Sequence, residues 1–409
     1  MEIDEWQELV AWYETNAPDH LAELEPPIRS QSDQFEIELP ATKDHDFPTN
    51  TAIHIDATSH RLLLGDSYAF NLDVYSAELV LEKEIPSGGA ISRIVTAPEN
   101  TYLATSMGGN IGQSEVPLGL LIKINANTQT PSAINRLVQR LHRPVDVIAD
   151  DFNGDGKTDY VIAEFGAYAG KLSLHLSQQD EALHETVLLN EAGAISIAVA
   201  GNDLMVLVAQ GDERIVRIND FAGNQPISQT LLRFPPSQGS SSMKMLDFNN
   251  DGLADLLYTA GDNADISPIF KPYHGIYLFL GQPNNSFQLE TFFHLDGAYG
   301  AVAEDFDQDG DYDIAAVSYF PNISNGLDET TFVYLENTNG NFEAKYIEGI
   351  GGLGRFIAIT AGDIDNDGDL DIALANLAFG PYGPLSVTPE LQKQWLRGTG
   401  FILLRNTLH

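Results

Sequence analysis

Apolar residues recur along this chain in short runs that are separated by residues favouring turns. Between residues 299 and 348, four runs follow one another, with the sequences YGAVAED, IAAVSYF, TFVYLEN and NFEAKYIE. Runs of this length and composition are typical of β-strands, and the Gly, Asn and Asp residues between them are typical of tight turns. The pattern predicts a unit of four consecutive antiparallel strands.

The same unit recurs along the chain, and an Asp-rich segment marks four of its copies. These segments read D-x-[DN]-x-D-G-x-x-D and begin at Asp151, Asp247, Asp305 and Asp363. The last three begin 58 residues apart, whereas 96 residues, or two units of 48, separate the first two. The unit between them, residues 194–218, has the same flanking strand patterns joined by a short turn. With two further upstream units, the first strands lie near Ile53, Ile94, Val147, Ile197, Met245, Val302 and Ile359.

Seven repeats that each supply four antiparallel strands are typical of a β-propeller. We therefore predict an all-β, seven-bladed β-propeller of four-stranded antiparallel blades over residues 31–409. The seventh unit lacks a fourth strand, and the segment SDQFEIELPA at residues 32–41 has the matching pattern. We expect residues 35–39 to pair with residues 401–405 and close the ring. Residues 1–30 are predicted to form a short helix and a linker, with the helix packed on the propeller or on an upstream domain.

Charge and composition exclude several classes of partner. The chain has 59 acidic and 21 basic residues, a formal net charge of −38, and no cysteine. Nucleic acids and anionic membranes require a cationic surface, so neither is expected as a partner. Disulfides and thiol catalysis are excluded. No apolar stretch is long enough for a transmembrane helix, and residues 1–10 do not resemble a signal peptide.

The Asp-rich segments have the chemistry that Ca²⁺ requires. Alternating oxygen ligands on a tight turn, with Gly at the sixth position, suit a hard cation. The predicted side-chain ligands are Asp151, Asn153, Asp155, Asp159, Asp247, Asn249, Asp251, Asp255, Asp305, Asp307, Asp309, Asp313, Asp363, Asp365, Asp367 and Asp371. The predicted carbonyl ligands are Lys157, Leu253, Asp311 and Asp369. We expect about four Ca²⁺ ions, the alternative being turns that bind no metal.

An EF-hand is excluded by the residues around these segments. It requires a Glu at the twelfth position and a helix on each side. In this chain the twelfth position holds Ile162, Tyr258, Ala316 or Leu374, and the flanking segments have strand patterns. Extracellular calcium modules bind with dissociation constants of about 10⁻⁴–10⁻³ M, so such sites would be empty in the cytosol. We therefore expect a secreted, periplasmic or outer-surface protein whose export signal is not present in this chain.

Over residues 43–409, the loops and blade pattern resemble the FG-GAP/VCBS repeat family of integrin-like calcium-binding propellers, in its bacterial form. The resemblance implies a seven-bladed propeller, calcium in the loops between strands, and an adhesin, lectin or accessory domain at the cell surface. Phe165-Gly166 and Phe379-Gly380 supply the "FG" pair, whereas "GAP" is absent. Integrin-style adhesion is therefore not implied.

Long irregular segments are expected on the face opposite the calcium loops. They comprise residues 259–275, 318–330 and 375–398, and they combine cations with aromatic residues, which suits recognition of sugars. The candidate ligand-binding residues on this face are Arg143, Asp262, Asp265, Lys271, Tyr273, His274, Tyr319 and Arg355. We expect a monomeric, calcium-stabilised binding or adhesion module for glycan or protein. The alternatives are a polysaccharide lyase or hydrolase with its site at the channel mouth, a structural domain, or loops that only protect the face.

Overall fold

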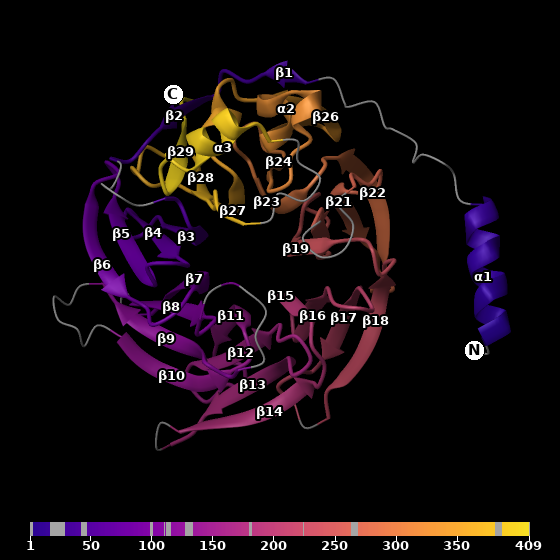
Figure 1. Cartoon of the computed structure of the whole chain (residues 1–409). Coiled ribbons are helices and arrows are strands. Elements are labelled where there is room, and N and C mark those ends of the chain that lie inside the picture. The colour runs from indigo at the N-terminus through magenta and orange to yellow at the C-terminus, as the bar shows by residue number, and fades with distance from the viewer. Residues whose placement is uncertain are drawn as a thin grey trace.

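Seven β-sheets stand around a central channel in the computed structural model (Figure 1). The structure describes residues 3–16, 29–41, 47–98, 101–109, 111, 116–126, 134–179, 182–223, 225–262, 269–380 and 387–408. Within each sheet the strands are antiparallel and follow one another in sequence from the channel outward, except at the two places where the N-terminal segment joins. The predicted seven-bladed β-propeller of four-stranded blades is confirmed.

The blades are numbered in chain order, and the strands of each blade follow from the channel outward. Blade 1 contains β3 (Asn50–Asp56), β4 (Arg61–Asp66), β5 (Asn71–Ser76) and β6 (Leu81–Pro86). Blade 2 contains β7 (Ile91–Ala97), β8 (Thr101–Ser106), β9 (Gly119–Asn125) and β10 (Ile134–Leu141). Blade 3 contains β11 (Pro144–Asp150), β12 (Asp159–Glu164), β13 (Lys171–Ser177) and β14 (Leu183–Leu189). Blade 4 contains β15 (Ala194–Ala200), β16 (Asp203–Val208), β17 (Arg214–Asn219) and β18 (Ile227–Arg233). Blade 5 contains β19 (Ser240–Leu246), β20 (Asp255–Ala260), β21 (Gly275–Gly281) and β22 (Phe287–His294). Blade 6 contains β23 (Ala298–Glu304), β24 (Asp313–Ser318), β25 (Phe332–Thr338) and β26 (Asn341–Tyr346). Blade 7 contains β27 (Phe356–Gly362), β28 (Asp371–Asn376), β29 (Phe401–Asn406) and β2 (Phe35–Glu38).

The core of the propeller lies between neighbouring blades. Strands such as β12, β20, β24 and β28 are buried along their whole lengths, because a blade packs against each of their two faces. This is why their sequences, such as DIAAVS, do not alternate between apolar and polar residues. The free energy that holds the ring together therefore comes mainly from apolar surface shared by adjacent sheets.

Polar side chains on the innermost strands also join several neighbouring blades. Each innermost strand has a register shift near its start. At this level Ser92 Oγ donates a hydrogen bond to the Pro144 carbonyl of the following blade at 2.7 Å. Thr51 and Ser241 make the equivalent bond at two other junctions, and Ser196 Oγ donates to the Met243 carbonyl, further along the strand, at a third. The repeated hydroxyl gives three of these junctions a common register.

The N-terminal segment closes the ring. Strand β2 pairs antiparallel with β29, joining Phe35 to Asn406 and Glu38 to Leu403. The predicted pairing is confirmed, with residues 35–38 facing residues 403–406. Upstream, β1 (Ser30–Gln31) pairs in parallel with β26 of blade 6, which the sequence did not indicate. The segment therefore binds two neighbouring blades.

Helices occupy few of the described residues. The predicted N-terminal helix is confirmed as α1 (Ile3–Asn16), but it stands apart from the ring in Figure 1, and Trp6 and Trp12 are each 58% exposed. Two segments expected to be irregular contain helices: η2 (Ile323–Asn325) with α2 (Leu327–Thr331), and α3 (Pro389–Trp395). A further short helix, η3 (Ile350–Gly352), precedes β27. No helix among the described residues is long and apolar enough to cross a bilayer.

Replacing Phe35 by Ala tests the closing strand. The Phe35 ring is 5% exposed and lies edge-on to the rings of Phe306 and Tyr334, at centroid distances of 5.9 and 5.3 Å. We expect Phe35→Ala to lower the free energy of unfolding by about 3–5 kcal/mol, measured by urea denaturation. The matched control, Trp6→Ala on the exposed helix α1, should change it by less than about 0.5 kcal/mol. Equal effects of the two substitutions would contradict the assigned role of β2.

Candidate metal centres

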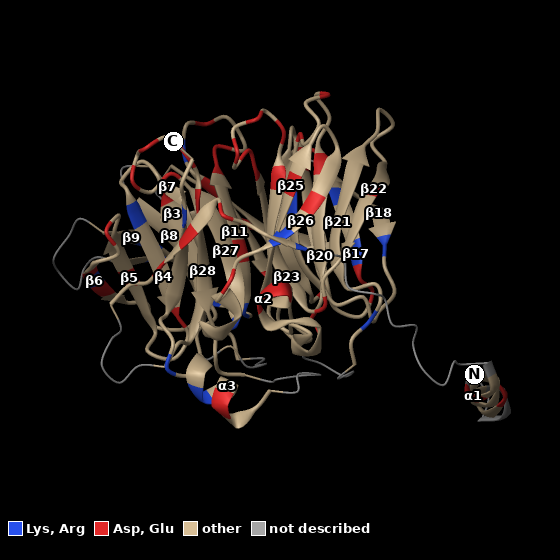
Figure 2. Ribbon diagram, turned by 90° about the horizontal axis from the view of Figure 1, so that it is seen from above, with Lys and Arg blue, Asp and Glu red and all other residues tan. Residues whose placement is uncertain are grey.

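The four Asp-rich loops lie on one face of the ring. They join β11 to β12, β19 to β20, β23 to β24 and β27 to β28, so each joins the first strand of a blade to the second. Figure 2 shows acidic residues gathered along this edge of the propeller, with α3 on the opposite side. Blades 3, 5, 6 and 7 therefore present the same kind of loop to the same face, as predicted, and each loop takes the number of its blade.

The four loops share one backbone conformation. The sixth-position glycines have φ between 83° and 99°, and the fourth position, occupied by Gly154, Asn250, Gln308 or Asn366, is also left-handed. A Cβ at Gly310 would meet no atom within 4 Å, so the backbone conformation rather than lack of space requires glycine. In loop 6 the Gly310 amide donates to Asp305 Oδ2 at 3.1 Å, and the other loops make the same bond.

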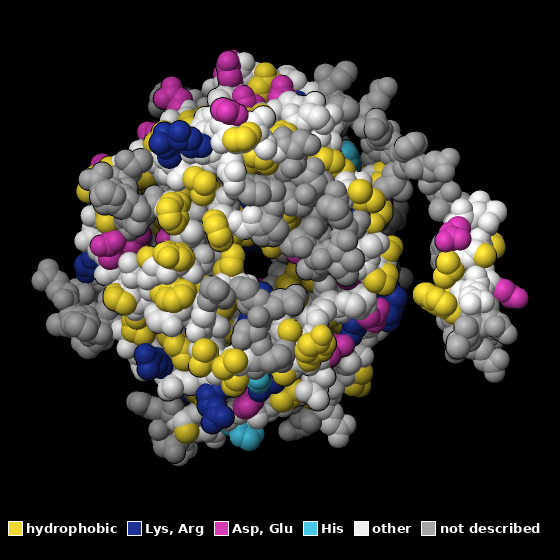
Figure 3. Space-filling view, viewed as in Figure 1, with side chains coloured by type: hydrophobic (Ala, Val, Ile, Leu, Met, Phe, Trp, Pro, Cys, Tyr) yellow, Lys and Arg dark blue, Asp and Glu magenta, His cyan; other side chains and the backbone are white. Residues whose placement is uncertain are grey.

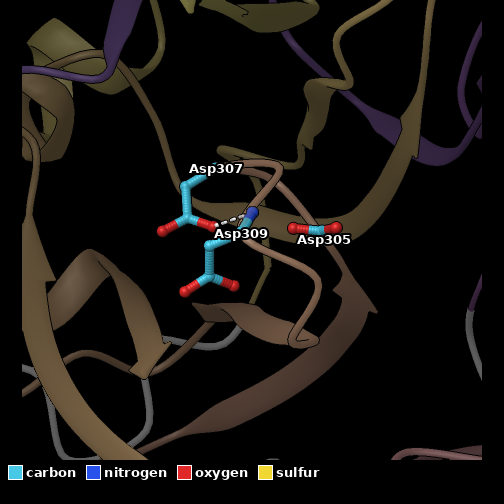
Figure 4. A group of neighbouring side chains, drawn as sticks. All are labelled: Asp305, Asp307 and Asp309. Carbon is cyan, nitrogen blue, oxygen red and sulfur yellow. Dashed lines mark hydrogen bonds between the residues drawn. The ribbon is translucent and has the colours of Figure 1, made fainter. Parts of the chain in front are cut away.

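Two of the loops bring three carboxylates together. Asp305, Asp307 and Asp309 in loop 6 each offer an oxygen within 4.8 Å of the others, and Figure 4 shows this group. Asp363, Asp365 and Asp367 form the same cluster in loop 7. The Asp305 Oδ1 atom is buried and accepts no hydrogen bond from the described residues. Such clustered, incompletely satisfied carboxylates fit a hard divalent cation, and both clusters can hold a metal ion.

Loops 3 and 5 carry an amide in place of the third-position carboxylate. In loop 5 the Asn249 side-chain nitrogen donates to Asp251 Oδ2 at 3.1 Å, which neutralises part of the repulsion inside the loop. The backbone turn is unchanged, since the Asp251 amide donates to Asp247 Oδ1 and Asn249 Oδ1 as its equivalent does in loop 3. Metal binding at these two loops, and by the carbonyls of Lys157, Leu253, Asp311 and Asp369, stays a prediction.

The ninth-position aspartates have a structural role in addition to the ligand role predicted for them. Asp159, Asp255, Asp313 and Asp371 are fully buried beneath their loops. Asp255, for example, accepts from the Gly281 amide at 2.7 Å and from the Phe248 amide at 2.8 Å. The second strand is thereby tied to the end of the third strand and to the loop itself. The corresponding contacts involve Ser177, Asn337 and Asn406 in the other three blades.

Burial and crowding make these carboxyl groups difficult to ionise without a metal. Burial raises the pKa of Asp313 to about 6 and the pKa of Asp371 to about 7. Asp369 has a pKa of about 6, raised by burial and then by the charges of Asp367 and its neighbours. Its carboxylate accepts no hydrogen bond among the described residues, and the sequence indicated only its carbonyl. A bound cation would favour the ionised form of every one of these groups.

A residue that the sequence did not single out, Arg405, already compensates part of the charge in loop 7. Its guanidinium lies 2.9 Å from Asp365 Oδ2, 3.1 Å from Asp371 Oδ2 and 2.9 Å from Glu38 Oε2. Arg405 is on β29 and Glu38 is on β2, so this ion-pair network joins the closing strand to the loop. A single Arg within a terminal strand gives no signal in a sequence pattern, which is why it was missed.

Four of the eight candidate ligand-binding residues on the opposite face are buried. Lys271, His274, Tyr319 and Arg355 belong to the interior, and the Arg355 guanidinium lies 4.1 Å from the centroid of the Tyr319 ring. Arg143 is half-buried and donates to the Ile111 carbonyl at 3.2 Å. Tyr273 and Asp262 are partly exposed, and Asp265 lies outside the described residues. The buried side chains support this face from the interior. Ligand contact by the eight candidate residues stays a prediction.

A groove on that face was not apparent from the sequence. It has a volume of about 530 Å³ and lies between α3, the residues that follow η3, and Leu39 at the end of the closing strand. Three segments far apart in the chain form it, so only the closed ring creates it. The signals for α3 itself are present in the sequence: Thr388 caps the helix by accepting the Leu391 amide, and Pro389 follows at the first helical position.

Removing calcium should make stability fall as the pH rises. The carboxyl groups of Asp313, Asp369 and Asp371 have a higher pKa in the folded than in the unfolded chain, where it is about 3.9. Their contribution is therefore fully present below about pH 4 and is lost as the pH rises through 6 to 7. We expect the melting temperature of calcium-stripped protein to decrease between pH 5 and pH 8, and millimolar calcium to reduce this decrease. A rise in stability of the stripped protein over this range would contradict the assignment.

Replacing Arg405 by Met tests its role as an internal counter-ion. The change leaves three carboxylates without their cation, and we expect it to lower the free energy of unfolding by about 1.5–3 kcal/mol in calcium-free buffer. The loss should be smaller in millimolar calcium, because the ion then compensates Asp365 and Asp371. Arg61→Met, which removes a pair with Glu82 at 3.0 Å, is the control, with an effect below about 1 kcal/mol that calcium does not change. Equal losses for Arg405→Met with and without calcium would exclude the proposed compensation.

Comparison with known proteins agrees with this architecture. The FG-GAP-like repeat model matches residues 247–316 and again residues 305–374. No curated protein matches the chain. Among solved structures, the N-terminal domain of Nup159 is similar at 12% identity and a TM-score of 0.51, over 94% of this chain and 98% of that one. A chain of the S. cerevisiae complex of Dbp5 with Nup159, Gle1, IP6 and ADP is similar at 9% identity and a TM-score of 0.51, over 94% and 99%. These likenesses concern the fold alone, and the matched repeats contain the loops of blades 5, 6 and 7. The chain is a seven-bladed β-propeller that carries FG-GAP-like repeats.

Proposed function

We propose that this protein is a calcium-stabilised binding module, which recognises a glycan or protein ligand on the face opposite its calcium loops. The observation that carries the proposal is the division between the two faces. One face carries four loops of a single conformation, two of which each bring three carboxylates together. The other face carries the long segments between second and third strands, one of which, with the residues that follow η3 and with Leu39, lines a groove of about 530 Å³. Repeated loops suit a shared structural task, whereas irregular segments on a rigid scaffold suit recognition.

Calcium is proposed to stabilise the ring rather than to take part in chemistry. Four bound ions would reduce the formal net charge of the chain from −38 to −30 and would remove repulsion inside each loop. Calcium present at about 100 times its dissociation constant adds about 2.7 kcal/mol of stability for each independent site. Because loops of this kind bind in the millimolar range, we propose a location outside the cytosol: secreted, periplasmic or on the outer cell surface.

The carboxylate count of each loop predicts an order of calcium affinity. Loops 6 and 7 contain an Asp at the third position and loops 3 and 5 contain an Asn, and affinity rises with the charge of the ligand set. Arg405 competes with the ion in loop 7, so loop 6 should bind most tightly. We expect calorimetric titration to count about four ions, and Asp307→Asn to weaken the tightest site by about tenfold. Glu290→Gln, an exposed substitution away from the loops, should leave the titration unchanged.

The same titration is paired with thermal melts in EDTA and in millimolar calcium. Binding of about four ions together with a large rise in melting temperature supports a calcium-stabilised module that works outside the cytosol. Absence of bound calcium and of any shift in melting temperature would overturn both the metal assignment and the proposed location.

A further inference from the structure

The groove beside α3 has walls that are held rigidly from behind. The Trp395 side chain is fully buried, and its Nε1 donates to the Gly351 carbonyl in η3 at 2.8 Å. The buried Asn376 side chain donates to the Thr399 carbonyl at 2.9 Å and accepts from the Arg355 amide at 3.0 Å. These contacts join α3, the residues that follow it and the entry to β27. The shape of the groove is thus set before any ligand arrives, as is usual in binding pockets.

Two cations on the groove are free to meet a ligand. Lys393 and Arg397 line it, both side chains are exposed, and neither forms an ion pair with any residue that the structure describes. Lys393 lies in the last turn of α3, and Arg397 follows the end of the helix by two residues. Figure 3 shows one patch of Lys or Arg atoms beside the position of α3, with other such patches elsewhere around the ring. The chain has a formal net charge of −38, so two neighbouring cations that form no ion pair with the described residues are a local exception to its negative charge.

The other residues that line the groove restrict the chemical class of ligand that it can bind. Leu39 and Leu353 supply apolar surface, while Glu390 and Gln394 supply hydrogen-bond acceptors and a donor next to the cations. The Glu390 carboxylate disfavours a doubly charged phosphate, because like charges in close proximity repel. A ring with one carboxylate, several hydroxyls and an apolar C–H face would satisfy all of these groups. The volume of about 530 Å³ lies within the range of about 300–1,000 Å³ that small-ligand sites occupy.

We propose that this groove binds a carboxylate-bearing sugar unit, a uronic acid at the end or in a short stretch of an acidic glycan. The inference rests on the proposed binding function and names its ligand class. Arg397 and Lys393 hold the carboxylate by charge-assisted hydrogen bonds, Glu390 and Gln394 contact hydroxyls, and Leu353 and Leu39 pack against the ring. Calcium is needed only to keep the ring closed, and the sugar does not bind to it.

The test measures trigalacturonate and neutral galactotriose by calorimetry, with the calcium-loaded full chain. We expect trigalacturonate to bind at least tenfold more tightly than galactotriose. The double substitution Lys393→Gln with Arg397→Gln should weaken trigalacturonate binding at least tenfold, with an unchanged melting temperature. The control Arg136→Gln removes another exposed cation, on the outer strand β10, that forms no ion pair within the described part of the chain, and this variant should bind as the unmodified chain does.

Three outcomes overturn the inference. They are absence of trigalacturonate binding, equal binding of the acidic and neutral sugars, and unchanged binding by the double variant. In the last case Asp307→Asn identifies a sugar held through calcium on the opposite face, because that substitution would then weaken binding. None of these outcomes alters the calcium count or the calcium-dependent melt, so failure of this inference is distinguishable from failure of the calcium-stabilised module.

Discussion

The pairing of β2 with β29 is the interaction on which the rest of this structure depends. Each blade buries one face against the blade before it and one against the blade after it, so an open ring would expose an apolar face and an unpaired strand edge. Four residues from the start of the chain and four from its end prevent this. Strand β1 adds a second attachment to blade 6, and the Gln34 side chain donates to the Phe306 carbonyl at 2.7 Å. The N-terminal segment therefore joins the two blades that carry the triple-aspartate loops.

Closure and the metal loops are connected through β29. Asn406 donates through its backbone to Asp371 at 3.0 Å, and Arg405 bridges Asp365 and Asp371 to Glu38 on the closing strand. The loop of blade 7 is thus bound to the same strand that completes the ring. Neighbouring loops also touch, since the Gln308 side chain donates to the Gly368 carbonyl at 3.1 Å. Charge neutralisation in these loops consequently acts on the part of the molecule where the ring is joined.

The two faces of the propeller have different physical tasks. On one face, identical turns concentrate negative charge and leave carboxylate oxygens without hydrogen bonds, an arrangement that a divalent cation stabilises. On the other, segments of unequal length fold over the ring, and buried side chains such as Trp395 and Arg355 support them from beneath. Ligand recognition on the second face is proposed to depend on the first only through the stability of the ring.

The sequence by itself determined the blade count, the strand order, the closing strand and the position of all four loops, because these depend on local patterns repeated at a regular spacing. It did not indicate the parallel pairing of β1, the counter-ion Arg405 or the buried carboxylate of Asp369, each of which depends on contacts between distant segments. The burial of Lys271, His274 and Arg355 was likewise unpredictable. A polar or charged residue in an irregular segment is expected to be exposed, and only the packing of the folded propeller shows that it is buried. The groove beside α3 was decided by tertiary structure alone, because its walls come from residue 39, the segment around residue 353 and the segment around residue 397, which meet only when the ring closes.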